Sequence, residues 1–157
     1  MRIFISIVLI ISSFYVSFGQ EEKEFDIVIV IDDVVANNVE NLKMKLTDTR
    51  GDYFTVSPKY HPGSFMVKQS QYEKMMSEDI KSIEITFSYN SEHKGKSKGY
   101  YYTINYGKKW LKEPFSVLSI YNLDRKKYKR LYEPINSDVK YSASIDFGHY
   151  SILNLKQ

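Results

Sequence analysis

The clearest pattern in the sequence is a strict alternation of apolar and polar residues in two neighbouring segments. It runs from Ile83 to Tyr89 and again from Tyr100 to Tyr106, and a polar, lysine-rich stretch at 90–99 separates the two. Because successive side chains of a strand point to opposite faces, each segment has one apolar and one polar face. We interpret the pair as a long β-hairpin in which Tyr101 is the one large side chain on the outer face.

Shorter segments of the same kind occur along the rest of the chain. The apolar run Phe25–Ile31 predicts a strand that is central or covered on both faces. Further strands are predicted at 42–46, 53–56, 64–68, 115–123, 127–132, 141–147 and 150–155. Turn-forming residues recur about every ten positions, which is typical of a β-sandwich or a β-barrel and not of βαβ units. We expect an all-β fold of about eight to ten strands.

One short helix is predicted near residues 70–77. The segment Ser70–Glu73 has the form of a capping box, in which Ser70 is the N-cap residue and Glu73 bonds back to it. Met75 and Met76 follow on the predicted helix. Because methionine fills irregular gaps in cores, we interpret this helix as a plug over one end of the sheets.

The segment Asp146–Tyr150, with the sequence Asp-Phe-Gly-His-Tyr, joins the last two predicted strands. It resembles the tyrosine corner of immunoglobulin-like sandwiches, in which a tyrosine hydroxyl bonds back to upstream backbone. The resemblance implies an antiparallel β-sandwich of immunoglobulin-like or transthyretin-like type. Ile152 stands where an immunoglobulin has its second cysteine, and the strand that usually follows this corner is missing. We expect either that Phe25–Ile31 takes the place of that strand or that the sheet ends on an exposed edge.

The first nineteen residues have the organisation of a secretory signal peptide. Arg2 precedes the aliphatic run Ile3–Ile11, and the small residues Ser17 and Gly19 form a cleavage site. We expect cleavage after Gly19, which leaves residues 20–157 as a single domain. The alternative is that the uncharged run at 3–19 remains as a membrane anchor. Export of a chain without cysteines suits the periplasm or the cell surface of a bacterium.

The residue types exclude several kinds of chemistry. Because the chain has no cysteine, it can use neither thiol catalysis nor thiolate metal ligands. The three histidines fall in predicted turns and loops, and the sequence has no nucleotide-binding or hydrolase motif. We therefore expect no catalytic residue, no cofactor and no metal site. At Asp32–Asp33 two interpretations stay open, a calcium-binding loop and a pair of turn-capping carboxylates.

Charge is unevenly distributed along a chain whose formal net charge is +3. Residues 20–40 contain seven acidic residues and one lysine, and the rest of the chain is basic. Cations beside an exposed aromatic ring suit a sugar ring or a protein partner. The candidate binding residues are Tyr101, Lys108, Lys109, Trp110, Lys112, Arg125, Lys127 and Lys129. For Trp110 the alternative is that its ring folds back as a lid on the core.

These observations together predict a non-enzymatic, exported binding module of the bacterial cell envelope. Its partner would be another envelope protein, as for an inhibitor, an immunity-like protein or a component of a surface assembly, or an anionic glycan. A protein partner could pair with an edge strand near either end of the chain. The alternative is a small-ligand carrier of closed-barrel type, with tyrosines lining its cavity. The export signal argues against a nucleic-acid partner.

Overall fold

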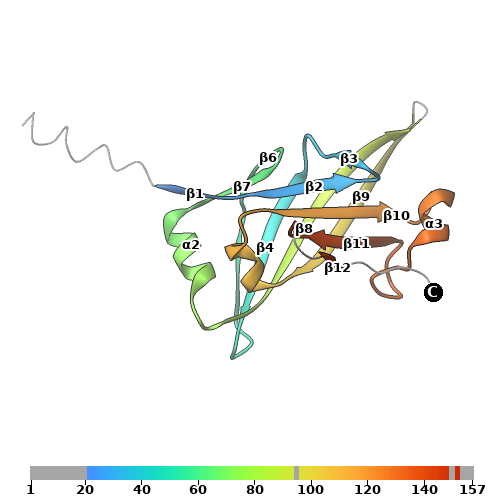
Figure 1. Cartoon of the computed structure of the whole chain (residues 1–157). Coiled ribbons are helices and arrows are strands. Elements are labelled where there is room, and N and C mark those ends of the chain that lie inside the picture. The colour runs from blue at the N-terminus through green and yellow to red at the C-terminus, as the bar shows by residue number, and fades with distance from the viewer. Residues whose placement is uncertain (1–20, 94–95, 149–150, 153–157) are drawn as a thin grey trace, which may run out of the picture.

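The computed structural model describes residues 21–93, 96–148 and 151–152, and these residues form twelve strands in three sheets (Figure 1). The predicted all-β class is confirmed. The predicted signal peptide and the last two residues of the tyrosine-corner motif, His149 and Tyr150, lie outside the described residues. Within the described part of the chain, no helix has both the length and the apolar character needed to cross a membrane.

One sheet has five strands, in the spatial order β12, β11, β10, β2, β3. Their bounds are β12 (Ser151–Ile152), β11 (Tyr141–Asp146), β10 (Ser116–Asn122), β2 (Ile27–Ile31) and β3 (Val34–Val35). Strand β2 runs parallel to β10, whereas the other neighbours in this sheet are antiparallel. The N-terminal segment therefore joins the same sheet as the C-terminal strands.

A second sheet has four antiparallel strands, in the order β5, β4, β8, β9. Their bounds are β5 (Tyr53–Val56), β4 (Glu40–Asp48), β8 (Ile80–His93) and β9 (Lys96–Tyr106). Strands β8 and β9 form the predicted hairpin, and their register is unbroken from Ile83 opposite Tyr106 to His93 opposite Lys96. The hairpin is longer than predicted because it extends into the polar stretch at 90–99. Strand β9 is one edge of this sheet, and β5 is the other.

The third sheet and the helices complete the molecule. The sheet has the order β1 (Glu22–Phe25), β7 (Ser64–Lys68), β6 (Lys59–His61). The helices are α2 (Gln69–Met76), the 3-10 helix η1 (Lys108–Lys112) and α3 (Lys126–Leu131). In Figure 1, α2 lies beside β1 and β7, and α3 lies at the far end of β10.

The three sheets share one hydrophobic core. Each sheet contributes side chains that are completely buried, such as Ile29 from β2, Phe65 from β7 and Ile85 from β8. Met75 of α2 is also buried and Met76 packs against the core, in agreement with the predicted plug. Figure 1 shows β2, β10 and β11 running across β4, β8 and β9. Burial of one face of each sheet therefore follows the alternation seen in the sequence.

Two predicted strands are wrong in detail. The segment Phe25–Ile31 is not one strand, because the exposed Asp26 separates β1 from β2 and the two belong to different sheets. Strand β2 itself is central, as predicted, since it lies between β10 and β3, and it has one buried and one half-buried face. The predicted strand at 127–132 is helix α3 and its C-cap residue Tyr132, whose backbone is extended. Tyr128 in the helix and Tyr132 at its end both contact the ring of Tyr121 in β10.

The predicted capping box is also wrong, because the helix begins earlier. Gln69 is the first residue of α2 and Lys68 is its N-cap residue. The backbone N–H of Lys68 donates to the side-chain oxygen of Gln71 over 3.2 Å, so Gln71 takes the role that was expected of Glu73. The predicted loops at 58–63 and 107–114 contain strand β6 and helix η1 respectively.

Candidate functional site

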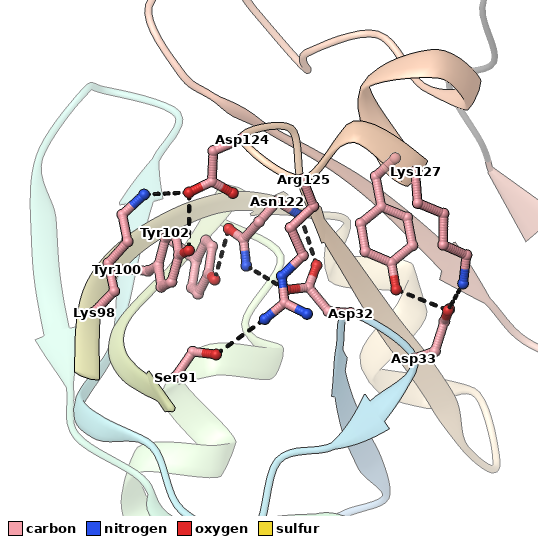
Figure 2. A network of polar contacts seen from close by, with 11 residues as sticks. Asp32, Asp33, Ser91, Lys98, Tyr100, Tyr102, Asn122, Asp124, Arg125 and Lys127 are labelled. Carbon is pink, nitrogen blue, oxygen red and sulfur yellow. Dashed lines mark hydrogen bonds and ion pairs between the residues drawn. The ribbon is translucent and has the colours of Figure 1, made fainter. Parts of the chain in front are cut away.

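A network of polar contacts joins the two larger sheets at one end of the molecule (Figure 2). Its centre is Asp32, which lies with Asp33 in the tight turn between β2 and β3, and both residues have positive φ, 53° and 69°. Aspartate tolerates this backbone conformation better than most residues. Asp32 is only 8% exposed, so its charge needs partners within the protein.

Asp32 is fully engaged by β10 and by the turn that follows it. Its Oδ1 accepts the backbone N–H of Asn122 at 2.8 Å, and its Oδ2 accepts the amide of the same residue at 2.9 Å. The Nε of Arg125 lies 2.9 Å from Oδ2. The amide oxygen of Asn122 in turn accepts the hydroxyl of Tyr102 from β9 at 3.0 Å. Burial raises the pKa of Tyr102 well above its usual range, so this hydroxyl stays a donor.

Asp33 forms an ion pair with Lys127. Its Oδ2 accepts the Nζ of Lys127 at 2.5 Å and the hydroxyl of Tyr128 at 2.8 Å. The hydrogen bond from Lys127 and, with a smaller effect, that from Tyr128 hold the pKa of Asp33 below its ordinary value. Burial, together with Asp33, raises the pKa of Tyr128 to about 12. Of the two interpretations of this acidic pair, the structure therefore supports turn carboxylates, whose counter-cations are Arg125 and Lys127.

Arg125 and Lys127 thus form ion pairs within the chain. Arg125 pairs with the buried Asp32, whereas Lys127 and Asp33 pair at the surface, where their side chains are 64% and 51% exposed. The acidic N-terminal segment neutralises part of the basic body that follows it. Among the described residues, no group of three or more His, Cys, Asp or Glu side chains could hold a metal ion. Lys129 is exposed on α3.

The predicted cluster around Trp110 lies on helix η1, and its ring packs on the core. The indole contacts Tyr106 and Phe147, both with ring centroids 5.3 Å apart. Gly107 lies against the indole face. The structure therefore places Trp110 as a lid on the core, as the alternative interpretation proposed. Lys108 donates to the backbone carbonyl of Ser77, whereas Lys109 and Lys112 are exposed.

Tyr101 is exposed on the outer face of β9, as predicted, with 62% of its surface accessible. The edge of β9 beside it carries a feature that the sequence did not reveal. The hydroxyl of Tyr141, from β11, accepts the backbone N–H of Thr103 and donates to the backbone carbonyl of the same residue, both over 2.8 Å. Both backbone groups of Thr103 therefore point away from β8.

The regular register of the hairpin extends this conclusion along β9. In an antiparallel pair, residues two apart direct their N–H and C=O groups to the same side. Because the register is unbroken, Tyr101 and Asn105 also direct their backbone groups to the outer edge. Neither residue has a backbone partner there among the described residues. Thus β9 presents a row of hydrogen-bonding groups, of which Tyr141 satisfies the middle pair.

Two cavities lie along this edge, one on each side of Tyr141. The cavity at the Asn105 end has a volume of about 290 Å³ and a mainly apolar wall that includes Trp110, Ile135, Ala143 and Ile145. The cavity at the Gly99 end has a volume of about 310 Å³ and a more polar wall that includes Tyr101, Asp124 and Lys140. Val139 and Tyr141 line both cavities. Together the two cavities and the outer edge of β9 form what we call the β9 groove.

The predicted site residues are therefore not brought together. Tyr101 and Trp110 lie at the β9 groove, and Arg125 and Lys127 belong to the Asp32 network. An exposed aromatic residue on an edge strand was the one sequence signal for the groove, and nothing in the sequence indicates the contact between Tyr141 and Thr103. Comparison of the chain with protein-family models, with curated proteins and with solved structures finds no match.

Proposed function

We propose that this protein is an exported, non-enzymatic interaction module of the bacterial cell envelope, and that it binds an extended segment of another protein along β9. The edge position of β9, with the backbone groups of Tyr101 and Asn105 directed outward, is the observation that carries the proposal. Addition of a strand to such an edge is a common mode of peptide recognition. The signal-peptide pattern of residues 1–19 supports export.

The chemistry of the groove favours a polypeptide over the other partners considered. A row of backbone donors and acceptors at strand spacing is complementary to an extended polypeptide. The glycan alternative depends on the rings of Trp110 and Tyr101, and only Tyr101 is exposed, because Trp110 is packed on the core. The small-ligand alternative depends on the cavities, but both lie open beside β9 and each is small for a ligand site.

The charges that line the groove differ between its two ends. Glu84 lines the cavity at the Asn105 end, whereas Lys140 and Asp138 both line the cavity at the Gly99 end and offset each other there. None of the three side chains forms an ion pair with another described residue. A strand antiparallel to β9 begins beside Asn105 and ends beside Gly99. A basic residue at the start of such a segment would therefore face Glu84.

The resemblance of residues 146–150 to a tyrosine corner supports a finer description of the fold. We propose that the mostly antiparallel sheets form a β-sandwich of immunoglobulin-like type, a scaffold that is common in binding modules. The backbone N–H of Gly148 donates to Asp146 over 2.7 Å and Gly148 has a φ of 81°, so the first part of this motif forms a tight turn. Fold alone does not specify a partner, so the proposal depends on the β9 groove.

The experiment is a pull-down of the tagged mature chain from its own cell envelope, compared between two variants at one position. Tyr101→Pro removes an outward backbone N–H without removing a hydrogen bond to β8, because this N–H does not face β8. Tyr101→Ala removes the side chain and keeps the N–H. We expect the wild type and Tyr101→Ala to retain one partner protein in an amount equal to that of the tagged chain. We expect Tyr101→Pro to lose it.

Two results would contradict edge pairing. If both variants retained the protein, binding would not use the β9 edge. If both variants lost it, the side chain of Tyr101 would be recognised and not the backbone. The equivalent pair Asn105→Pro and Asn105→Ala repeats the test at the other end of the groove. Amide exchange of the β8–β9 ladder would confirm that each variant is folded.

A further inference from the structure

The hydroxyl of Tyr141 occupies the place that a partner strand would take on β9. It satisfies both backbone groups of Thr103 with two bonds of 2.8 Å, as the N–H and C=O groups of a paired strand would. Thr103 lies midway between Tyr101 and Asn105, and Tyr141 lines both cavities of the groove. A continuous strand therefore cannot pair along β9 while this hydroxyl remains in place.

We propose that Tyr141 is a latch on the β9 groove, which an incoming extended segment of a partner protein displaces from Thr103. This inference rests on the proposed function. The latch also protects the chain from unwanted pairing, because an open edge strand is a template for association. The bound segment would gain the two backbone bonds that the hydroxyl gives up.

Two features of Tyr141 suit a displaceable latch. It is buried, with 6% of its surface exposed, and it reaches the edge through its side chain, which makes an edge-to-face contact with Tyr102 at 5.1 Å and the two hydrogen bonds. The cavities on either side of the ring provide space beside it. Apparent affinity falls in proportion to the fraction of molecules in which the site is open. Removal of the hydroxyl should therefore strengthen binding.

The first measurement is amide hydrogen exchange in Tyr141→Phe, which keeps the ring and loses both bonds. We expect the Thr103 amide to exchange at least about tenfold faster than in the wild type, since one hydrogen bond is typically worth this factor. Tyr60→Phe is the matched control, because the Tyr60 hydroxyl also bonds to a backbone carbonyl, that of Ala36, away from the groove. The control should leave the exchange of Thr103 unchanged.

The second measurement is binding of a fluorescent, terminally blocked peptide with the sequence Lys-Thr-Val-Thr-Val-Thr-Glu. We expect Tyr141→Phe to bind it about tenfold more tightly than the wild type, and to bind the reversed peptide Glu-Thr-Val-Thr-Val-Thr-Lys more weakly. A purely structural role for the hydroxyl predicts the opposite sign, because a less stable groove would bind more weakly. Tighter binding by a less stable variant would therefore be specific to a latch.

The outcomes separate this inference from the function on which it rests. Equal or weaker binding by Tyr141→Phe, with binding abolished by Tyr101→Pro, would overturn the latch and leave the proposed function standing. Absence of binding to the wild type and to Tyr141→Phe would contradict both. A concentration-dependent dimer of Tyr141→Phe in sedimentation, with no peptide binding, would assign the edge to a second copy of the chain and overturn the inference.

Discussion

Asp32 is the residue that stabilises most directly the end of the molecule at which the polar network lies. Its carboxylate is buried in a left-handed turn and holds Asn122 and Arg125, two residues that lie about ninety positions further along the chain. Removal of one partner of such a buried pair leaves the other with an uncompensated charge. The network therefore stabilises the contact between the two larger sheets more than a surface ion pair would.

We expect Asp32→Asn to lower the free energy of unfolding by about 2–4 kcal/mol. The lower part of that range applies because the side chain of Arg125 is 34% exposed and water compensates part of its charge. Urea denaturation followed by circular dichroism measures the change. Asp52→Asn is the control, since Asp52 is 80% exposed and its pair with Arg50 should contribute less than about 1 kcal/mol. Equal losses in the two variants would contradict a structural role for the network.

The ion pair of Asp33, in the same turn, makes the stability of the folded protein depend on pH. The pKa of Asp33 is lower in the folded protein than in the unfolded chain, so its ion pair contributes stability above the unfolded value of about 3.9 and loses it as the pH falls through the lower folded value. We expect the stability of the wild type to fall more steeply below about pH 4 than that of Asp33→Asn. Denaturation midpoints measured between about pH 2 and pH 6 would test this, and parallel curves would contradict it.

At the scale of elements, a prediction from the sequence succeeds where a local pattern of residues encodes the element. It fails where contacts between distant residues decide the structure. The β8–β9 hairpin was predictable because its apolar face is encoded by uninterrupted alternation. Helix α3 was not, because six residues are too few to separate a period of 2 from one of 3.6, and the packing of Tyr128 and Tyr132 against Tyr121 decides the outcome. The contact of Tyr141 with Thr103 joins two sheets, so no local pattern encodes it.

Helix η1 is positioned by the packing of Gly107 against Trp110. A Cβ atom at Gly107 would lie 2.9 Å from the indole, whereas the backbone φ of −71° is accessible to any residue. We expect Gly107→Ala to displace the ring and to cost about 1–3 kcal/mol of stability. Because Trp110 is the only tryptophan, a red shift of intrinsic fluorescence reports its displacement. Gly99→Ala is the control, and an unchanged spectrum in Gly107→Ala would refute the packing described.

At the scale of the whole molecule, ion pairs within the fold neutralise part of the uneven charge of the sequence. Asp32, Asp33 and Glu22 of the acidic N-terminal segment pair with Arg125, Lys127 and Lys59. The sequence indicated a cationic surface at 125–130, and Lys126, Lys127, Lys129 and Arg130 are exposed there. It did not show that Arg125 and Lys127 meet Asp32 and Asp33 in the fold. The surface that we assign to a partner is the edge of β9.

The most direct test of this account is residue-resolved amide exchange of the protein with and without its captured partner. Strand pairing on β9 predicts that the amides of Tyr101 and Asn105 become more protected on binding, whereas the Thr103 amide exchanges its bond to Tyr141 for one to the partner. The intervening amides of Tyr102 and Ile104 already face β8 and should change little. Protection that appears instead on helix η1 or α3, with no change at Tyr101 and Asn105, would contradict the account.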